Sequence, residues 1–457
     1  MLVYLIVAGA VLLACLLLSN FGSASTSRPR AAVIVFSHFP QDPRPRREAE
    51  SLLKNGFEVD IFCLRREQND QLCEDVGGAK VYRLPLRRRR SGKLRYAFEY
   101  GAFLTASFLF LGLRSFRLYR LVHIHNMPDV LVFSAIVPRI LGAKVILDLH
   151  DPVPEVYRVI YDLKKESLTV RALQTVEKWS IAFADLVLTP NLAFREIFVS
   201  RGCPPEKIRI VMNSPDESIF NIHDYSGRVK RPGYNLMFHG TLLKRNGLSL
   251  AVAAVAKLRE RIPCLKLLIY GEQTPYISEL MREVERLDLL STVEYLGYSP
   301  LHQVPAAISA IDVGLVPNLA NPFNNINLPT RIFEYLALAK LPIVPRTKGI
   351  QDYFQEEEIL FFQAGDVEDL ANKIEWAFLN PVKANEILQR GRKVYEKHRW
   401  ETEEKNFLNL VRGLSRFHPP LKENSKGLGR QLEFNRVTMR SEMKQKPSEG
   451  ERAKAAY

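Results

Sequence analysis

The chain has 457 residues, 47% of them hydrophobic and 25% charged, which is enough for about two to four domains with full cores. Its five cysteines are scattered and lack the paired spacing that is typical of a zinc site or a disulfide framework. This favours a reducing compartment. The net charge of +14 suits an anionic partner, but no zinc finger or ribonucleoprotein motif points to nucleic acid.

Residues 1–27 contain no charged side chain, and the first positive charges are Arg28 and Arg30. The segment is either a membrane anchor or a signal peptide. It lacks the basic start of a signal peptide, although residues 23–25 could pass as a cleavage site. Since basic residues stay on the cytoplasmic side, we expect an uncleaved single-pass transmembrane helix with the remaining chain in the cytoplasm.

The next 180 or so residues alternate short apolar runs with helical stretches, the pattern of a parallel sheet covered on both faces. The predicted strands are 31–36, 57–63, 81–84, 121–124, 143–148, 185–189 and 208–211, with a helix at 44–55. In the stretch 42–49, which follows the first strand and includes the start of that helix, Arg44 and Arg46 could bind a pyrophosphate through forked hydrogen bonds. Alternatively they are ordinary helix residues, although positive charge opposes the dipole there.

A basic and aromatic region follows, with eleven Lys or Arg and one acid, Glu99, between residues 80 and 120. It includes the run Arg87 to Arg90 and an uncharged stretch, 100–113, that is shorter than the roughly 20 residues of a spanning helix. We expect an interfacial helix on anionic lipid. The alternative is a buried helix beside a solvated basic loop.

The strand at 143–148 ends in a polar cluster in which His150 stands between Asp148 and Asp151. Open α/β sheets bind ligands at the carboxyl edge of their strands, so this cluster predicts a site. A lone histidine would more often be structural. Glu155, farther along, either shapes the loop or lies on the surface.

A polar break at 213–233 predicts an interdomain linker, after which the alternation restarts. The predicted strands are 234–238, 265–270, 293–296, 312–317 and 341–345, and the predicted helices are 248–261, 278–287 and 402–414. The basic tail, 418–457, has few large apolar residues and predicts disorder.

Three loops of the second half are candidate ligand contacts. Residues 238–247 form a strand, a glycine loop and a helix start, which suits a diphosphate. The turns 269–272 and 296–299 are either base contacts or plain turns. In 328–344, Glu334 lies on the first turns of a helix that leads into a buried strand, which places a carboxylate at the sheet edge. Arg331 and Glu334 could instead be a solvated ion pair.

Residues 328–344 closely resemble the donor-binding signature of retaining family-4 glycosyltransferases of the GT-B fold. With the stretches 42–49, 147–155 and 238–247 and the two turns, the resemblance runs from about residue 31 to residue 414. It implies an α/β chain of two Rossmann-like domains facing a central cleft. The acceptor domain would be 31–212 and the nucleotide-sugar domain 234–400, followed by a C-terminal helix, 401–417.

The resemblance also implies roles for particular residues. Glu334 would hold the ribose hydroxyls and His150 would face the donor sugar. The basic residues that usually clamp the pyrophosphate are replaced by Thr241 and Asn246, so Lys244 and especially Arg245 are the nearest substitutes. The first glutamate of the signature is replaced by Ile326. The other expected donor contacts are Gly240, Thr241, Gly271, Tyr298, Asn325, Asn327 and Arg331, and the acceptor-side residues are Asp42, Arg44, Arg46 and Asp151.

The sequence therefore predicts a membrane-associated glycosyltransferase of lipid-linked glycan or exopolysaccharide assembly. Its predicted catalytic residues are His150, Arg245 and Glu334. Its expected partners are a nucleotide sugar, anionic lipid and a polyprenyl-linked acceptor, and retention is implied by the resemblance. No Asp-x-Asp occurs, so neither a metal nor a cofactor is expected. A catalytically silent scaffold of the same fold and a nucleotide-sugar epimerase are the alternatives.

Overall fold

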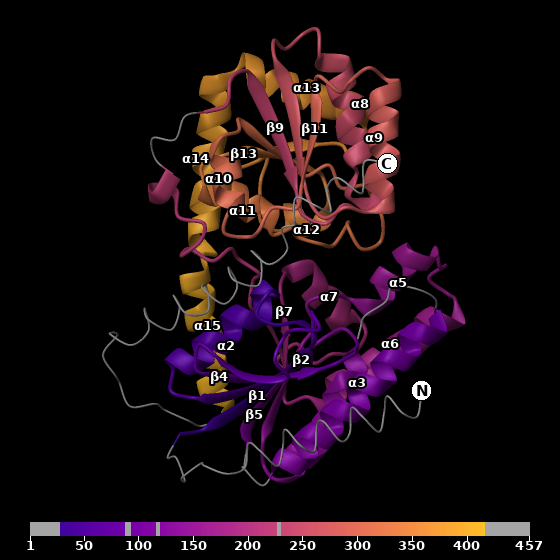
Figure 1. Cartoon of the computed structure of the whole chain (residues 1–457), viewed down its shortest axis with the longest axis vertical. Helices are drawn as coiled ribbons and strands as arrows, with labels where there is room; N and C mark the ends of the chain where they lie inside the picture. The colour runs from indigo at the N-terminus through magenta and orange to yellow at the C-terminus, as the bar shows by residue number, and fades with distance from the viewer. Residues whose placement is uncertain (1–27, 87–92, 116–118, 226–229, 416–457) are drawn as a thin grey trace.

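The computed structural model describes residues 28–86, 93–115, 119–225 and 230–415, which form two α/β domains, one above the other in Figure 1. The predicted anchor at 1–27, the run Arg87 to Arg90 and the tail at 418–457 lie outside the described residues. None of the described helices is both long and apolar enough to cross a bilayer.

The N-terminal domain is built on one twisted sheet, for which the described residues supply eight strands in the order β3-β4-β2-β1-β5-β6-β7-β8. All neighbours in it are parallel except the β3–β4 pair. The strands are β1 (Arg30–His38), β2 (Glu58–Leu64), β3 (Cys73–Val76), β4 (Ala79–Leu84), β5 (Tyr119–His125), β6 (Lys144–Asp148), β7 (Leu186–Thr189) and β8 (Ile208–Ile210).

Helices cover both faces of this sheet, so successive residues of β1 enter different cores. Ala32 and Ile34 pack toward α3, whereas Ala31 and Val33 pack toward α2. The helices of this domain are α2 (Pro43–Lys54), α3 (Lys93–Arg114), η2 (Asp129–Ala135), α4 (Ile136–Ile140), α5 (Val153–Tyr161), α6 (Leu168–Phe183) and α7 (Leu192–Ser200).

The C-terminal domain repeats the plan with a parallel sheet, whose six described strands run in the order β11-β10-β9-β12-β13-β14. They are β9 (Tyr234–His239), β10 (Leu265–Tyr270), β11 (Val293–Gly297), β12 (Val313–Leu315), β13 (Leu341–Pro345) and β14 (Leu360–Phe362). The helices are η3 (Ile222–Tyr225), η4 (Lys244–Asn246), α8 (Leu248–Leu258), α9 (Pro275–Arg286), α10 (Val304–Ser309), α11 (Arg331–Ala337), α12 (Lys348–Gln351), α13 (Val367–Leu379) and α14 (Pro381–Lys397).

The last helix, α15 (Trp400–Ser415), leaves the C-terminal domain and packs beside α2 of the other domain (Figure 1). Phe407 and Val411 are fully buried in the core between α2 and the sheet. The hydroxyl of Ser51 on α2 donates a 2.6 Å hydrogen bond to Glu404. This helix, near the C-terminal end of the described residues, therefore packs on the domain formed by their N-terminal half.

The stretch predicted to be an interfacial helix is part of α3, and only one side of it faces solvent. Phe103 and Phe110 are fully buried against Phe62 of the sheet, as the alternative interpretation required. Leu109 and Leu113 are nearly half exposed. The helix thus contributes to the core and also presents apolar side chains to the outside.

Candidate functional site

The carboxylate predicted to hold a ribose is placed by close packing of α11 on the sheet. The hydroxyl of Tyr335 donates a 2.8 Å hydrogen bond to the carbonyl of Met237 on β9. A Cβ on Gly314 of β12 would come within 2.3 Å of the Tyr335 ring, so only glycine allows this approach. As a result Glu334, at the start of α11, lies against the carboxyl end of β9.

The surroundings of Glu334 are unusual for a carboxylate. Its Oε2 lies 3.2 Å from Nε2 of His239. Burial raises the pKa of Glu334 to about 7, against the opposing effects of Arg331 and Arg47. Burial also lowers the pKa of His239 to about 3, so this ring is neutral and supplies no positive charge. Glu334 is therefore poised to bind hydroxyls rather than to form an ion pair with His239.

Arg331 is held beside the glycine loop. Its guanidinium stacks 4.4 Å from the centre of the Phe238 ring. One of its nitrogens, Nη1, is buried without a hydrogen-bond partner. Gly240 has φ +118°, and a Cβ there would lie 3.4 Å from Nη2 of Arg331. The glycine thus leaves room between the loop and a cation that still has a donor to offer.

The glycine loop itself is fixed by its main chain. Gly247 has φ +72° and lies so close to the Pro317 carbonyl that a Cβ would clash with it. The side chain of Asn246 donates a 2.7 Å bond to the Thr241 carbonyl, so it braces the loop. Thr241 and Lys244 are exposed.

Arg245 occupies a more defined place than Lys244. Its carbonyl accepts hydrogen bonds from the amide of Leu319 at 3.1 Å and from the side chain of Asn324 at 2.8 Å. Its guanidinium lies 5.4 Å from the centre of the Phe323 ring. The segment 319–325 therefore backs the loop and orients Arg245.

The remaining predicted donor contacts differ in exposure. Gly271 is buried, and a Cβ on it would meet the Gly240 carbonyl at 2.3 Å, so it is needed for packing. Tyr298 and Asn325 are exposed, and Asn327 is partly so. Asn324, in contrast, is buried, and its side-chain nitrogen donates hydrogen bonds to two main-chain carbonyls. The roles of these residues toward a donor stay predictions.

In the N-terminal domain, the expected acceptor-side arginines bind protein carboxylates. Arg44 donates to both oxygens of Asp148, at 2.6 and 2.9 Å. Arg46 donates to Asp216 at 3.0 Å. Both guanidiniums are almost completely buried. They hold α2 against β6 and against the interdomain segment, and binding of an acceptor by them stays a prediction.

His150 and Asp151 lie at the carboxyl end of β6, at the edge that faces the C-terminal domain. The side-chain oxygen of Asn126 accepts from the amide of His150 at 3.2 Å, and its nitrogen donates to the Asp151 carbonyl at 2.6 Å. Burial raises the pKa of Asp151, against His150 and Arg245. Arg245 is thus close enough across the cleft to act on this carboxylate. Asp42 lies partly exposed at the start of α2.

A second link between the domains runs beside Glu334. Arg47 donates a short hydrogen bond to the Asn213 side chain, which in turn donates to the Thr330 hydroxyl at 3.1 Å. Thr330 precedes α11, so this chain of contacts connects α2 with the helix that carries Glu334. Sequence reasoning did not assign Arg47, His239 or Asn213 to the site. His239 directly precedes Gly240, so its place at a strand end was the available signal.

Beneath the edge lies a buried polar cluster that sequence reasoning missed. Glu48, His123, His125 and Asp148 have potential ligand atoms that all lie within 4.8 Å of one another. Nδ1 of His125 is 3.1 Å from Asp148. Burial would raise the pKa of Asp148, but Arg44 and His125 outweigh it and hold that pKa well below its usual range. Arg44 supplies a cation to Asp148, whereas both carboxylate oxygens of Glu48 and both ring nitrogens of His123 are buried without a hydrogen-bond partner among the described residues.

Two family models match the chain, one in each domain. Residues 42–214 match the glycosyl transferase 4-like domain, and residues 227–394 match the glycosyl transferases group 1 family. Among curated proteins, WcaL of Salmonella typhimurium, named for colanic acid biosynthesis, is 28% identical over 35% of this chain and 39% of its own length. WcaL of Escherichia coli is 27% identical over 31% of this chain and 34% of its own length. The chain thus spans less than two fifths of these relatives.

Solved structures show the same fold over nearly their whole length. Sucrose-phosphate synthase from Thermosynechococcus elongatus has a TM-score of 0.69 at 20% identity, covering 85% of this chain and 99% of its own. The Anabaena protein HepE in complex with UDP has a TM-score of 0.60 at 13% identity, covering 84% and 100%. These likenesses confirm the predicted two-domain α/β architecture.

Proposed function

We propose that this chain, a glycosyltransferase with both domains of the GT-B fold, moves a sugar from a nucleotide diphosphate to an acceptor in polysaccharide assembly. The observation that carries the proposal is the opposition of two sheet edges. Glu334 and Arg331 lie beside the glycine loop, and Arg245 of that loop opposes the burial that raises the pKa of Asp151 in the other domain. Two sets of polar groups that converge on one cleft suit a donor on one side and an acceptor on the other.

Each group has a proposed task. Glu334 accepts hydrogen bonds from the ribose hydroxyls, and the backbone of the glycine loop with Arg245 neutralises the departing diphosphate. His150 orients the sugar from the opposite edge. Arg331 has a buried nitrogen without a partner, and it adds positive charge beside Gly240. Positioning and charge stabilisation then perform the transfer without a base–nucleophile pair.

The finer parts of the proposal concern the donor, the stereochemistry and the acceptor. HepE is described with UDP and with UDP-glucose, which supports a uridine diphosphate sugar as the first donor to test. The WcaL relatives are named for colanic acid, which supports a polysaccharide acceptor, and we propose that it is lipid-linked at the cytoplasmic membrane face. Retention is proposed from the resemblance of residues 328–344 to the retaining signature.

The test is to incubate membranes that contain the full chain with a panel of labelled UDP, GDP and ADP sugars and then to extract lipid. We expect one donor to label the lipid fraction, and Glu334→Gln to lose most of this labelling. Donor binding without transfer to any acceptor would favour the silent scaffold. Interconversion of the sugar on the free nucleotide would favour an epimerase.

A further inference from the structure

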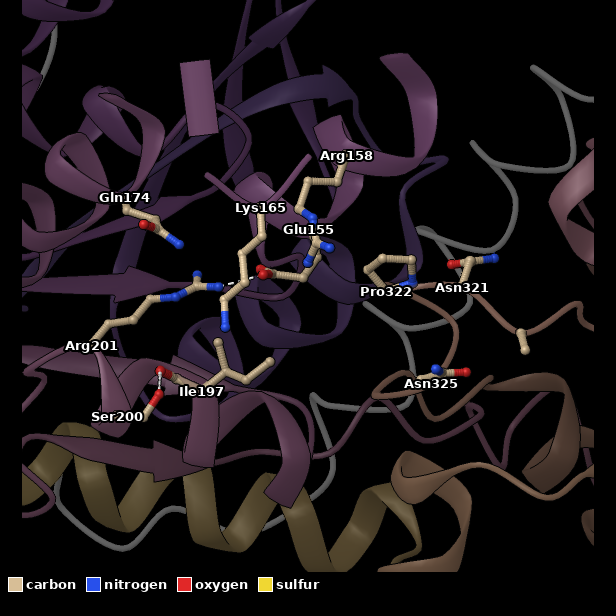
Figure 2. Close-up of a pocket in the computed structure, with 11 residues that line it drawn as sticks. Glu155, Arg158, Lys165, Gln174, Ile197, Ser200, Arg201, Asn321, Pro322 and Asn325 are labelled. Atoms are coloured by element: carbon tan, nitrogen blue, oxygen red, sulfur yellow. Dashed lines mark hydrogen bonds and ion pairs between the residues drawn. The ribbon is translucent and has the colours of Figure 1, made fainter. Parts of the chain in front are cut away.

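An open cavity lies beside the proposed reaction centre, between the two domains (Figure 2). Its volume is about 650 Å³, which is within the usual range for small-molecule sites. The N-terminal wall comes from α5, α6 and α7, and the C-terminal wall is the segment 320–325. Since segment 319–325 also holds the Arg245 main chain, the cavity and the glycine loop share a wall.

Two cations that line the cavity, Arg158 and Lys165, form no ion pair with the described residues. Figure 2 shows Arg158 of α5 and Lys165 reaching into the space from the N-terminal side. Nε of Arg158 is buried without a hydrogen-bond acceptor in the described part of the chain. A buried donor nitrogen without an acceptor is costly unless a ligand supplies the acceptor.

The third cation of the cavity, Arg201, is already neutralised. It forms a short ion pair with Glu155 and lies 3.0 Å from Glu177. These contacts settle the role of Glu155, which is buried and structural rather than a surface residue. The carboxylate in the wall therefore does not cancel Arg158 and Lys165, and the cavity keeps an excess of positive charge.

The position of Arg158 relates the cavity to the chemistry. α5 begins at Val153, directly after the segment that contains His150 and Asp151. Along a helix, Arg158 is then about 8 Å from the start of α5. A phosphate held there would leave an attached sugar able to reach back toward His150. Arg44 and Arg46, the arginines expected on the acceptor side, donate hydrogen bonds to Asp148 and Asp216.

We infer that Arg158 and Lys165 bind a phosphate or diphosphate ester on the acceptor, so that the acceptor substrates of this chain are anionic. The inference rests on the proposed glycosyltransferase function and names the class of its second substrate. Guanidinium and ammonium groups bind phosphate oxygens through charge-assisted hydrogen bonds, and Arg158 can engage two oxygens at once. The ester comes from either a lipid-linked diphosphate sugar or a soluble sugar phosphate.

The first experiment measures binding without catalysis. Inorganic pyrophosphate is titrated calorimetrically into the full chain, into Arg158→Ala/Lys165→Ala and into Arg245→Ala. We expect two classes of site, one lost in the double variant and the other in Arg245→Ala. Arg171→Ala is the matched control, because Arg171 is an exposed arginine on α6 outside the cavity, and it should keep both classes. Unchanged binding by the double variant overturns the inference.

The second experiment measures acceptor use with one sugar presented in three forms: as a polyprenyl diphosphate, as a soluble sugar phosphate and as a neutral alkyl glycoside. For the phosphorylated forms we expect the double variant to raise KM by at least about 10- to 100-fold, the effect of losing one charge-assisted bond. Hydrolysis of the nucleotide sugar without acceptor should stay unchanged. Preference for one phosphorylated form identifies the source of the ester, whereas equal use of the neutral glycoside overturns the inference. If the unmodified chain does not hydrolyse the nucleotide sugar, this result would instead contradict the proposed function.

Discussion

Nε2 of His239 lies 3.2 Å from Oε2 of Glu334, where the end of β9 meets the first turn of α11. The histidine is neutral because burial lowers its pKa to about 3. The contact therefore orients the carboxylate without neutralising its charge. The carboxylate oxygens can still accept hydrogen bonds from a bound hydroxyl.

Replacing Glu334 by Gln should weaken donor binding and leave the fold intact. The amide offers one acceptor where the carboxylate offers two oxygens, so we expect a loss of about 1.5–3 kcal/mol, the value of a hydrogen bond to a charged group. Calorimetric titration with the donor found active in the transfer assay measures the effect. Unchanged donor affinity in a variant with native thermal stability would remove Glu334 from the site.

Donor affinity should also depend on pH. The pKa of Glu334 is raised to about 7, so the carboxylate that accepts both ribose hydroxyls is formed as pH rises through 7. Affinity should increase from pH 6 to pH 8, and Glu334→Gln should show a flatter profile. The effect on stability has the opposite sign: the protonated group stabilises the fold below its unfolded pKa, and this contribution is lost as pH rises through 7. Equal slopes for variant and parent would contradict the assignment.

In the glycine loop, Arg245→Ala should lower turnover more than Lys244→Ala. Arg245 is partly buried beside Phe323 and acts on Asp151 across the cleft, whereas Lys244 is exposed. Loss of one charge-assisted contact to the departing diphosphate should cost about tenfold to a hundredfold in kcat. Steady-state kinetics on both variants measures this. Greater damage from Lys244→Ala would show that the leaving group lies on the other side of the loop.

Beneath the opposite edge, Arg44→Met should destabilise the protein by about 3–5 kcal/mol, because it leaves Asp148 buried without its cation. Urea denaturation measures the free energy of unfolding. The double variant Arg44→Met/Asp148→Leu should recover part of this loss, since no unpaired charge remains. If the double variant is as unstable as the single one, the arginine acts through packing and not through its charge.

The sequence predicted regular elements well and interaction partners poorly, for a physical reason. Apolar runs located β1, β9, β10 and β13 because strands buried on both faces carry few polar residues, such as Asn235 in β9 and Lys266 in β10. The strands β3 and β14, each at the edge of its sheet, were missed. Two of the four residues of β3 are acidic, so it has no apolar run.

The same limit applies to the site. From local sequence, His150 could be placed at a strand end and Glu334 on the first turns of a helix. The partner of Arg44 is 104 residues away, and the partner of Arg46 is 170 residues away. No local pattern could reveal that both arginines are already bound to carboxylates. Likewise, Arg158 gains significance only because segment 320–325, from the other domain, closes the cavity around it.

The exposed side of α3 leads to a last prediction, about the membrane. Leu109 and Leu113 are nearly half exposed on a helix that follows the basic run Arg87 to Arg90. Exposed apolar side chains on a helix, in a region of the sequence rich in basic residues, suit the interface of an acidic bilayer. A chain without residues 1–27 should therefore still sediment with acidic vesicles at low salt, and less so as salt increases.

Two variants of this shortened chain separate the contributions. Leu109→Ser/Leu113→Ser should weaken vesicle binding with little loss of stability, because neither side chain belongs to the core. Replacing Arg87 to Arg90 by Ser should release the shortened protein at moderate ionic strength, since each basic residue near an anionic surface contributes on the order of 1 kcal/mol. Neutral vesicles are the control and should bind weakly. If the shortened chain stays in the supernatant with acidic vesicles at low salt, α3 serves the core alone and residues 1–27 must account for any membrane association.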